Sequence, residues 1–292
     1  MSAMAEEENT KPLRGTQVLT LAVNVPGPAA AARLRELGAT VVKVEPPEGD
    51  PLAQANPDWY EALVSGQEII QLNLKETDDR TRLDELLDES DLLLTATRPA
   101  ALERLGLGWP ELHARHPQLS QTAIVGYPAP KDDVPGHDLT YLAGFGLLTP
   151  PELPRTLLAD LAGAERAVST SLALVLGREL GQGASYAQVP LSQAAEFFAE
   201  PLRYGITAPG GKLGGGLPNY NLYRAREGWI SVAALEPHFW QRLLDELDLK
   251  TADHEDLENI FLTRTAEDWE AWASERDLPM AAVREAPPLG EE

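Results

Sequence analysis

The chain contains no cysteine among its 292 residues, so neither a disulfide nor a thiolate metal site can form. This absence suits a reducing compartment, and we expect a cytoplasmic location. The opening residues MSAMAEEENTKPLRG are polar and acidic, and they lack the basic and apolar regions of a secretory signal peptide. No apolar run approaches the length that a bilayer-spanning helix needs. We therefore expect no membrane partner.

Positive charge is also scarce. The 24 lysine and arginine residues stand against 46 aspartate and glutamate residues, which gives a formal net charge of -22. Because the phosphates of a nucleic acid bind to basic surfaces, we expect no nucleic-acid partner. A small molecule that carries phosphate would need a local group of basic residues or backbone amides, since the overall field repels it.

Several motifs of common active sites are missing. The sequence has no zinc-type histidine spacing, no GxxxxGK phosphate loop and no GxSxG serine elbow. The stretch GGKLGGG lacks the strand-then-helix context of a dinucleotide fingerprint, so we interpret it as a flexible linker. The sequence therefore predicts no metal site.

Short apolar runs alternate with helical patterns along the first two thirds of the chain. TQVLTLAV, PGPAAAARLRELG and TVVKV are typical of a strand, a helix and a strand. Pro28 near the start and Gly38 just past the end of the middle segment support the helix. A strand, helix and strand in this order imply a parallel sheet. We expect an α/β fold with a Rossmann-like parallel sheet.

The composition changes near residue 205, where glycine and proline become frequent. NLYRAREGWISVAAL then predicts a hairpin that turns near Glu227 and Gly228, and helical patterns follow it. This arrangement indicates a second, smaller α+β domain. We expect a disordered N-terminus over 1–14, a large α/β domain over 15–204, a linker over 205–218, a small domain over 219–285 and a tail over 286–292.

Three ionisable residues occupy junctions between predicted strands and helices. His137 follows a strand and the loop 126–136, in the zone beyond the carboxyl end of a strand where ligands of parallel sheets bind. Asp160 stands just before a long helix, whose dipole and free amides stabilise an anion that can act as a base or a nucleophile. Glu236 ends a strand directly before Pro237.

Each of these residues also has a purely structural interpretation. His137 could be a surface or capping histidine, Asp160 a helix cap, and Glu236 a first-turn acid that complements the helix dipole. We expect Asp138 to cap the LTYLAG helix. His113 and His116 are expected to be solvated residues at a helix end, outside any site.

Six segments between about residues 15 and 285 carry a resemblance to a known family. They are NVPGPAAAARLRELGATVVKVEPPEGDPL, LNLK, TRPAALERLGLGWPELHARHPQL, GHDLTYLAG, LLADLAGAE and NLYRAREGWISVAALEPHF. Together they resemble the family III (CaiB/BaiF) CoA-transferases, and among them the α-methylacyl-CoA racemases. The GHDLTYL and ALEP segments favour the racemase branch.

The resemblance implies an enzyme that inverts the α-carbon of a 2-methylacyl-CoA thioester through an enolate. By motif match, His137 and Asp160 would move the proton, and Glu236 would stand beside His137. Coenzyme A would enter as the thioester substrate, with no covalently bound cofactor. The resemblance also implies an interlocked homodimer, and a further C-terminal segment that PPLGEE does not supply.

The contacts to coenzyme A must differ from those of the relatives, because VSGQEII replaces their basic stretch. Lys43, Lys75 and Arg98 are the candidate phosphate partners, and Tyr141 is a further candidate for binding coenzyme A. Two other functions stay open. The protein could be a CoA-transferase with Asp160 as nucleophile, or a degenerate homologue without catalytic activity.

Overall fold

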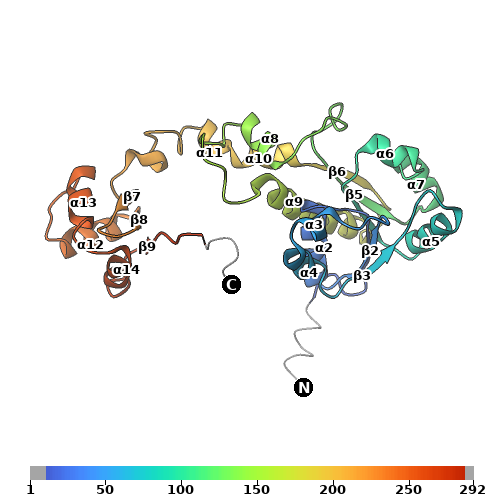
Figure 1. The fold of residues 1–292 in the computed structure, drawn as a ribbon, viewed down its shortest axis with the longest axis horizontal. Helices are drawn as coiled ribbons and strands as arrows, with labels where there is room; N and C mark the ends of the chain where they lie inside the picture. The colour runs from blue at the N-terminus through green and yellow to red at the C-terminus, as the bar shows by residue number, and fades with distance from the viewer. Residues whose placement is uncertain (1–10, 287–292) are drawn as a thin grey trace, which may run out of the picture. The chain divides into compact units, whose positions relative to one another are not determined.

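The computed structural model describes residues 11–286, which form two compact units that divide after Ala199 (Figure 1). The expected disorder over 1–14 and the tail over 286–292 therefore lie almost wholly outside the described residues. Residues 11–14 are described, and Leu13 among them is buried in the core of the large unit. Within the described residues, no helix is long and apolar enough to cross a membrane.

The large unit contains a six-stranded sheet in which every neighbouring pair is parallel. The strand order is β3-β2-β1-β4-β5-β6. This order confirms the Rossmann-like sheet, and it reverses between β1 and β4, where open α/β sheets bind ligands. The strands are β1 (Gln17–Thr20), β2 (Thr40–Glu45), β3 (Glu68–Gln71), β4 (Leu92–Thr95), β5 (Ser120–Val125) and β6 (Tyr186–Pro190).

Helices cover both faces of this sheet, as a parallel sheet requires. Figure 1 shows α2 and α9 on one side and α5, α6 and α7 on the other. Side chains alternate along β4. Leu92 and Leu94 therefore pack into the core on the α2 and α9 face, and Leu93 packs into the core on the opposite face. The helices are α2 (Pro26–Glu36), α3 (Pro51–Ala55), α4 (Pro57–Val64), α5 (Thr77–Asp88), α6 (Pro99–Arg104), α7 (Trp109–Arg115), α8 (Asp138–Gly144), α9 (Leu158–Glu179) and α10 (Leu191–Phe198).

The predicted βαβ unit at the start of the large unit is confirmed. Pro26 and Pro28 lie in the first turn of α2, where a missing amide costs nothing. Gly38 follows its end with a φ of 108°, a left-handed conformation that favours glycine.

The small unit is an antiparallel sheet of order β7-β8-β9 that packs against three helices. The predicted hairpin is confirmed, with Gly228 at a φ of 78° in its turn. Trp269 is buried at the centre, and its indole N–H donates to the backbone oxygen of Phe261 at 2.9 Å. The elements are α11 (Glu200–Arg203), η1 (Lys212–Gly216), β7 (Tyr220–Arg224), β8 (Trp229–Ala233), α12 (Pro237–Glu246), α13 (His254–Phe261), α14 (Ala266–Ser274) and β9 (Met280–Ala282).

Candidate active site

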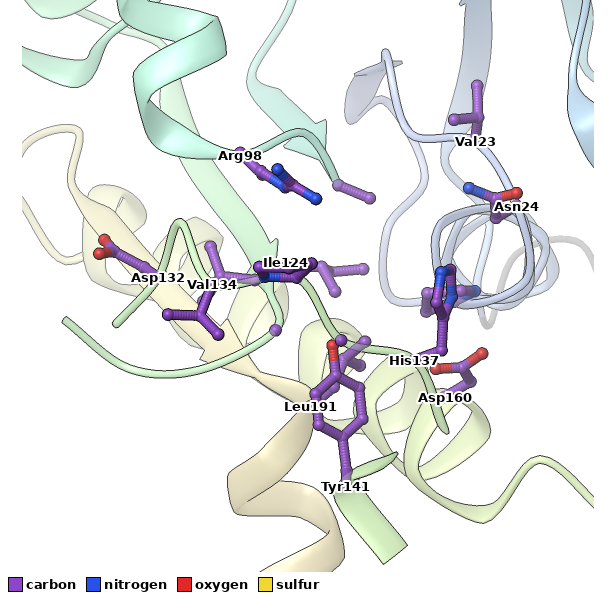
Figure 2. A pocket seen from close by; sticks show the side chains of 16 residues that line it. Val23, Asn24, Arg98, Ile124, Asp132, Val134, His137, Tyr141, Asp160 and Leu191 are labelled. Carbon is purple, nitrogen blue, oxygen red and sulfur yellow. The ribbon is translucent and has the colours of Figure 1, made fainter. Parts of the chain in front are cut away.

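A pocket of about 240 Å³ lies beyond the carboxyl ends of β1, β4 and β5. Asn24 follows β1, Arg98 follows β4, and both line it, so the pocket sits where the strand order reverses. Figure 2 shows His137 and Asp160 close together on one side of the pocket and Arg98 on the other. The structure thus brings two of the three predicted catalytic residues into one pocket.

His137 is held at the start of α8 by its backbone. Its amide donates to the hydroxyl oxygen of Thr140 at 3.0 Å, and that hydroxyl donates to the carbonyl oxygen of His137 at 2.7 Å. His137 itself occupies the N-cap position in an extended conformation. The imidazole therefore projects from a fixed point of the backbone rather than from a free loop.

Asp138 does not cap its own helix, and that expectation was wrong because His137 already holds the N-cap position. Its side chain is turned instead toward the start of α9. The Oδ1 atom accepts hydrogen bonds from the amides of Ala159 at 2.7 Å and Asp160 at 3.1 Å. Asp138 is only 4% exposed, so these two bonds join α8 to α9 within the interior.

Asp160 lies inside the first turn of α9 and not before the helix, because α9 begins at Leu158. Burial raises the pKa of its carboxyl group to about 6, and the negative charge of Asp138 adds to the effect. His137 acts in the opposite direction and lowers the pKa. Asp160 can therefore exist both as an acid and as a carboxylate near neutral pH, as a proton-transfer group must.

Tyr141 lines the same pocket and is buried. Burial, followed by the charge of Asp160, raises the pKa of its phenol to about 12, so the hydroxyl keeps its proton. Its ring meets Tyr127 edge-on, with 5.2 Å between the centroids. A Cβ atom at Gly126 would come within 2.6 Å of the Tyr141 hydroxyl, and one at Gly136 within 2.5 Å of the ring. Glycine at both positions therefore lets the loop 126–136 pass close over Tyr141 without a clash.

A model of the family described as CoA-transferase family III matches residues 13–288. The chain belongs to this family. A cinnamoyl-CoA:phenyllactate CoA-transferase from Clostridium sporogenes is 27% identical, with 95% of this chain and 79% of the relative covered. The α-methylacyl-CoA racemase of Homo sapiens is 30% identical, with 82% of this chain and 65% of the relative covered. The family III relatives thus include both racemases and transferases.

Solved structures of family III proteins share the fold. A crystal structure of Rv3272 from Mycobacterium tuberculosis is 26% identical, with a TM-score of 0.82 over 94% of this chain and 86% of that one. A CaiB/BaiF family protein from Brucella suis, 20% identical, superposes with a TM-score of 0.76 over 94% of this chain and 85% of that one.

Lys43 lies in the interior of this family III chain, although the sequence suggested a phosphate partner. Its side chain is 0% exposed, and its ammonium group lies 2.8 Å from Glu45 and 2.7 Å from Asp50. This placement argues against Lys43 as a ligand of a CoA phosphate. Asp50 also accepts the amide of Asn24 at 3.0 Å. Lys43 therefore acts on the pocket wall indirectly, since it holds Asp50, which holds the backbone of Asn24. Asn24 lines the pocket and has a left-handed φ of 66°.

The two other predicted phosphate partners lie in adjoining hollows. Arg98 lines the pocket of His137. Lys75 lines a second hollow of about 290 Å³ between the ends of β2, β3 and β4, whose walls include Val44, Leu72 and Leu102. Val23 lines both hollows, so the two are neighbours.

Glu236 belongs to the small unit. The strand β8 ends at Ala233, so Glu236 does not end the strand as predicted; it is the N-cap of α12 and not a first-turn acid. Pro237 opens α12, as the sequence predicted. Its carbonyl oxygen accepts the amide of Trp240 at 3.0 Å, and its side chain is exposed. Its expected position beside His137 stays a prediction.

The two histidines lie at the end of α7, as predicted, but they are not solvated: His113 is half-buried in the last turn, and His116 is the C-cap. His116 is buried, and its Nδ1 atom lies 2.7 Å from Asp88. His113 stacks on Trp109 with 4.7 Å between the ring centroids. Within residues 11–286, no group of three or more metal-ligating side chains is arranged to hold a metal ion.

Proposed function

We propose that this protein catalyses a 1,1-proton transfer at the α-carbon of an acyl-CoA thioester, with a 2-methylacyl-CoA as substrate. One observation carries the proposal: His137 and Asp160 line one pocket, and the pKa of Asp160 is about 6. Asp160 can therefore take up and return a proton near neutral pH, and the imidazole of His137 supplies the second proton-transfer group in the same pocket.

The carboxylate of Asp160 takes the α-proton, and the electrons of the broken C–H bond form an enolate with the thioester carbonyl. The imidazolium of His137 then donates a proton to the α-carbon, and the configuration is inverted when that proton reaches the opposite face. The reverse direction exchanges the two roles. Groups placed in this way contribute roughly 10²–10⁴-fold each.

The enolate oxygen needs a hydrogen-bond donor or a positive charge while it forms. Tyr141 and Arg98 are the suitable side chains of the pocket, since the Tyr141 hydroxyl keeps its proton at neutral pH. We assign the second hollow to the coenzyme A part of the substrate. Its apolar walls suit the pantetheine chain, and Lys75 offers a charge for a phosphate.

The interlocked homodimer that the family resemblance implies belongs to this proposal. In such a dimer, Glu236 of one subunit would orient His137 of the other. Sedimentation equilibrium tests this part, because a monomer at the concentrations of the activity assay would exclude a shared site.

A second candidate is CoA transfer, which the phenyllactate transferase among the relatives favours. In that reaction the carboxylate of Asp160 attacks the thioester carbonyl, the C–S bond breaks, and the CoA thiolate leaves a mixed anhydride. Hydroxylamine converts such an anhydride to a hydroxamate at Asp160. A racemase forms no covalent intermediate and is not trapped.

Solvent deuterium exchange tests the leading proposal. The protein is incubated with a 2-methylacyl-CoA in D₂O, and the α-carbon is followed by NMR. We expect deuterium to enter, and His137→Gln and Asp160→Asn to slow the exchange by about 10²–10⁴-fold. His254→Gln, in the small unit, is the matched control. If the thioester binds in calorimetry but no deuterium enters, the racemase proposal is wrong, and absence of binding would favour a non-catalytic homologue.

A further inference from the structure

The carboxyl group of Asp138 is a buried ionisable group that the proposed proton transfer does not use. It follows His137 directly in the chain, and its Oδ1 atom accepts the amides of Ala159 and Asp160. One buried side chain thus connects the backbone beside His137 to the backbone of Asp160 itself.

The start of α9 depends on this connection. The first amides of an α-helix have no partner within the helix and are usually satisfied by an N-cap side chain. The N-cap residue of α9 is Leu157, which makes no side-chain capping bond. Asp138 supplies the missing acceptor across a separation of 21 residues. A 22-residue helix is therefore anchored, at its end in the pocket, by the neighbour of His137.

Asp138 also adds charge to the surroundings of Asp160. The charges of Asp138, in α8, and of His137, at its start, act on that carboxyl. Tyr141, one turn further along α8, and Arg98, across the pocket, line the same pocket as Asp160. Burial is the main cause of the raised pKa of Asp160, and the charge of Asp138 is the next. Asp138 therefore affects both where Asp160 lies and how readily it accepts a proton.

We propose that Asp138 is a positioning residue that sets the place of Asp160 relative to His137 and couples its own charge to that of Asp160. This inference rests on the proposed function only in giving Asp160 a chemical role. It holds for proton transfer and for CoA transfer alike, because both need Asp160 in a fixed place.

Two substitutions separate the two effects. Asp138→Asn keeps an oxygen that can accept the two amides but removes the charge, and Asp138→Ala removes both. Asp133→Asn is the matched control. Asp133 lies in the loop 126–136 and likewise accepts an amide from the first turn of a helix, that of Ala100 in α6 at 3.3 Å. Its charge is not among the causes of the raised pKa of Asp160.

The first measurement is a ¹³C NMR titration of protein labelled at the aspartate carboxyl carbons, with the Asp160 signal assigned by its loss in Asp160→Asn. We expect Asp138→Asn to move the Asp160 titration to lower pH and Asp133→Asn to leave it in place. This readout needs no substrate, so it stands even if the protein proves not to be a racemase. An unmoved titration in Asp138→Asn overturns the coupling.

The second measurement is the rate of α-proton exchange against pH. We expect Asp138→Asn to shift the Asp160-dependent limb to lower pH. Asp138→Ala should lower kcat by about 10²-fold, the typical cost of misplacing a reacting group by about 1 Å, with little change in KM. Near-UV circular dichroism checks that each variant is folded. Full exchange in a folded Asp138→Ala protein overturns the positioning role, whereas absence of exchange in every protein, the unmutated one included, contradicts the proposed function alone.

Discussion

The ammonium group of Lys43 lies 2.7 Å from a carboxylate oxygen of Asp50, and both side chains are completely shielded from water. Glu45 holds the same ammonium group at 2.8 Å and also accepts the hydroxyl of Tyr60 at 2.5 Å. Two carboxylates therefore share one cation inside the large unit. Since Asp50 in turn holds the amide of Asn24, this buried group connects the stability of the fold to the shape of the pocket.

Replacement of Lys43 should therefore destabilise the protein strongly. Lys43→Met leaves Asp50 and Glu45 buried without their cation, and breaking a buried ion pair on one side costs about 3–5 kcal/mol. Urea unfolding measures the change. Arg33→Met is the control, because Arg33 pairs with Glu36 at the surface and such pairs contribute about 0–1 kcal/mol. Equal losses in the two variants would contradict the role given to Lys43.

Ionised Asp160 should lower the stability of the fold. The pKa of its carboxyl rises from 3.8 to about 6 on folding, so the folded protein binds this proton more tightly than the unfolded chain does. Stability must then fall as the pH rises from about 4 to about 6. We expect Asp160→Asn to stabilise the protein by about 2 kcal/mol at pH 7.5, because the half-buried carboxylate is only partly hydrated, and to lose this gain below about pH 4. Thermal unfolding across pH checks the prediction, and a gain that is independent of pH would refute it.

Tyr141→Phe should restore the stability lost on an alanine substitution at one of the two neighbouring glycines but not at the other. Gly126→Ala and Gly136→Ala both push a methyl group into Tyr141, and such overpacking costs about 1–3 kcal/mol. At Gly126 the clash is with the hydroxyl, at 2.6 Å, whereas at Gly136 two ring carbons, at 2.5 and 2.9 Å, are too close as well as the hydroxyl, at 2.8 Å. Tyr141→Phe should thus restore stability to Gly126→Ala but not to Gly136→Ala. Denaturant unfolding of each alanine variant, with and without Tyr141→Phe, measures the effect. Restored stability in both double variants would contradict these contacts.

Lys75 should bind a phosphate of coenzyme A, because it lines the hollow assigned to the coenzyme A part of the substrate. We expect Lys75→Gln to weaken binding of an acyl-CoA by about tenfold, the typical effect of one charge-assisted hydrogen bond. The loss should shrink at high salt. Calorimetry with an acyl-pantetheine, which lacks the nucleotide phosphates, supplies the control. Lys75→Gln should leave the affinity for acyl-pantetheine unchanged. An equal loss of affinity for acyl-CoA and acyl-pantetheine would show that Lys75 does not bind a nucleotide phosphate.

Sequence patterns predicted the large sheet well because its strands are short apolar runs separated by helices with clear starts and ends. The strand β6 was missed, since ASYAQVP follows a glycine-rich turn and only Val189 and Pro190 in it are buried. The helices α3 and α4 were also missed. Each begins with a proline, at Pro51 and Pro57, behind an aspartate or asparagine cap, and this signal was present in the sequence.

The pocket could be located from sequence only in part. His137 and Asp160 stand at strand-to-helix junctions, which parallel topology brings to one edge of the sheet. The roles of Lys43 and Asp138 could not be found in this way, because each depends on contacts between separate elements. A lysine within the apolar strand VVKV, followed by Glu45, is nevertheless a recognisable sign of a buried ion pair.

Val23 forms part of the wall of both hollows at the carboxyl edge of the large sheet. Under the proposed function, a wall shared in this way couples the binding of the acyl part of the substrate to the binding of its coenzyme A part. Enlarging residue 23 to exclude bulky acyl groups would also narrow the neighbouring cleft, and shrinking it would merge the two spaces. A substitution of Val23 that changes the preference for the acyl group should therefore also change the affinity for coenzyme A.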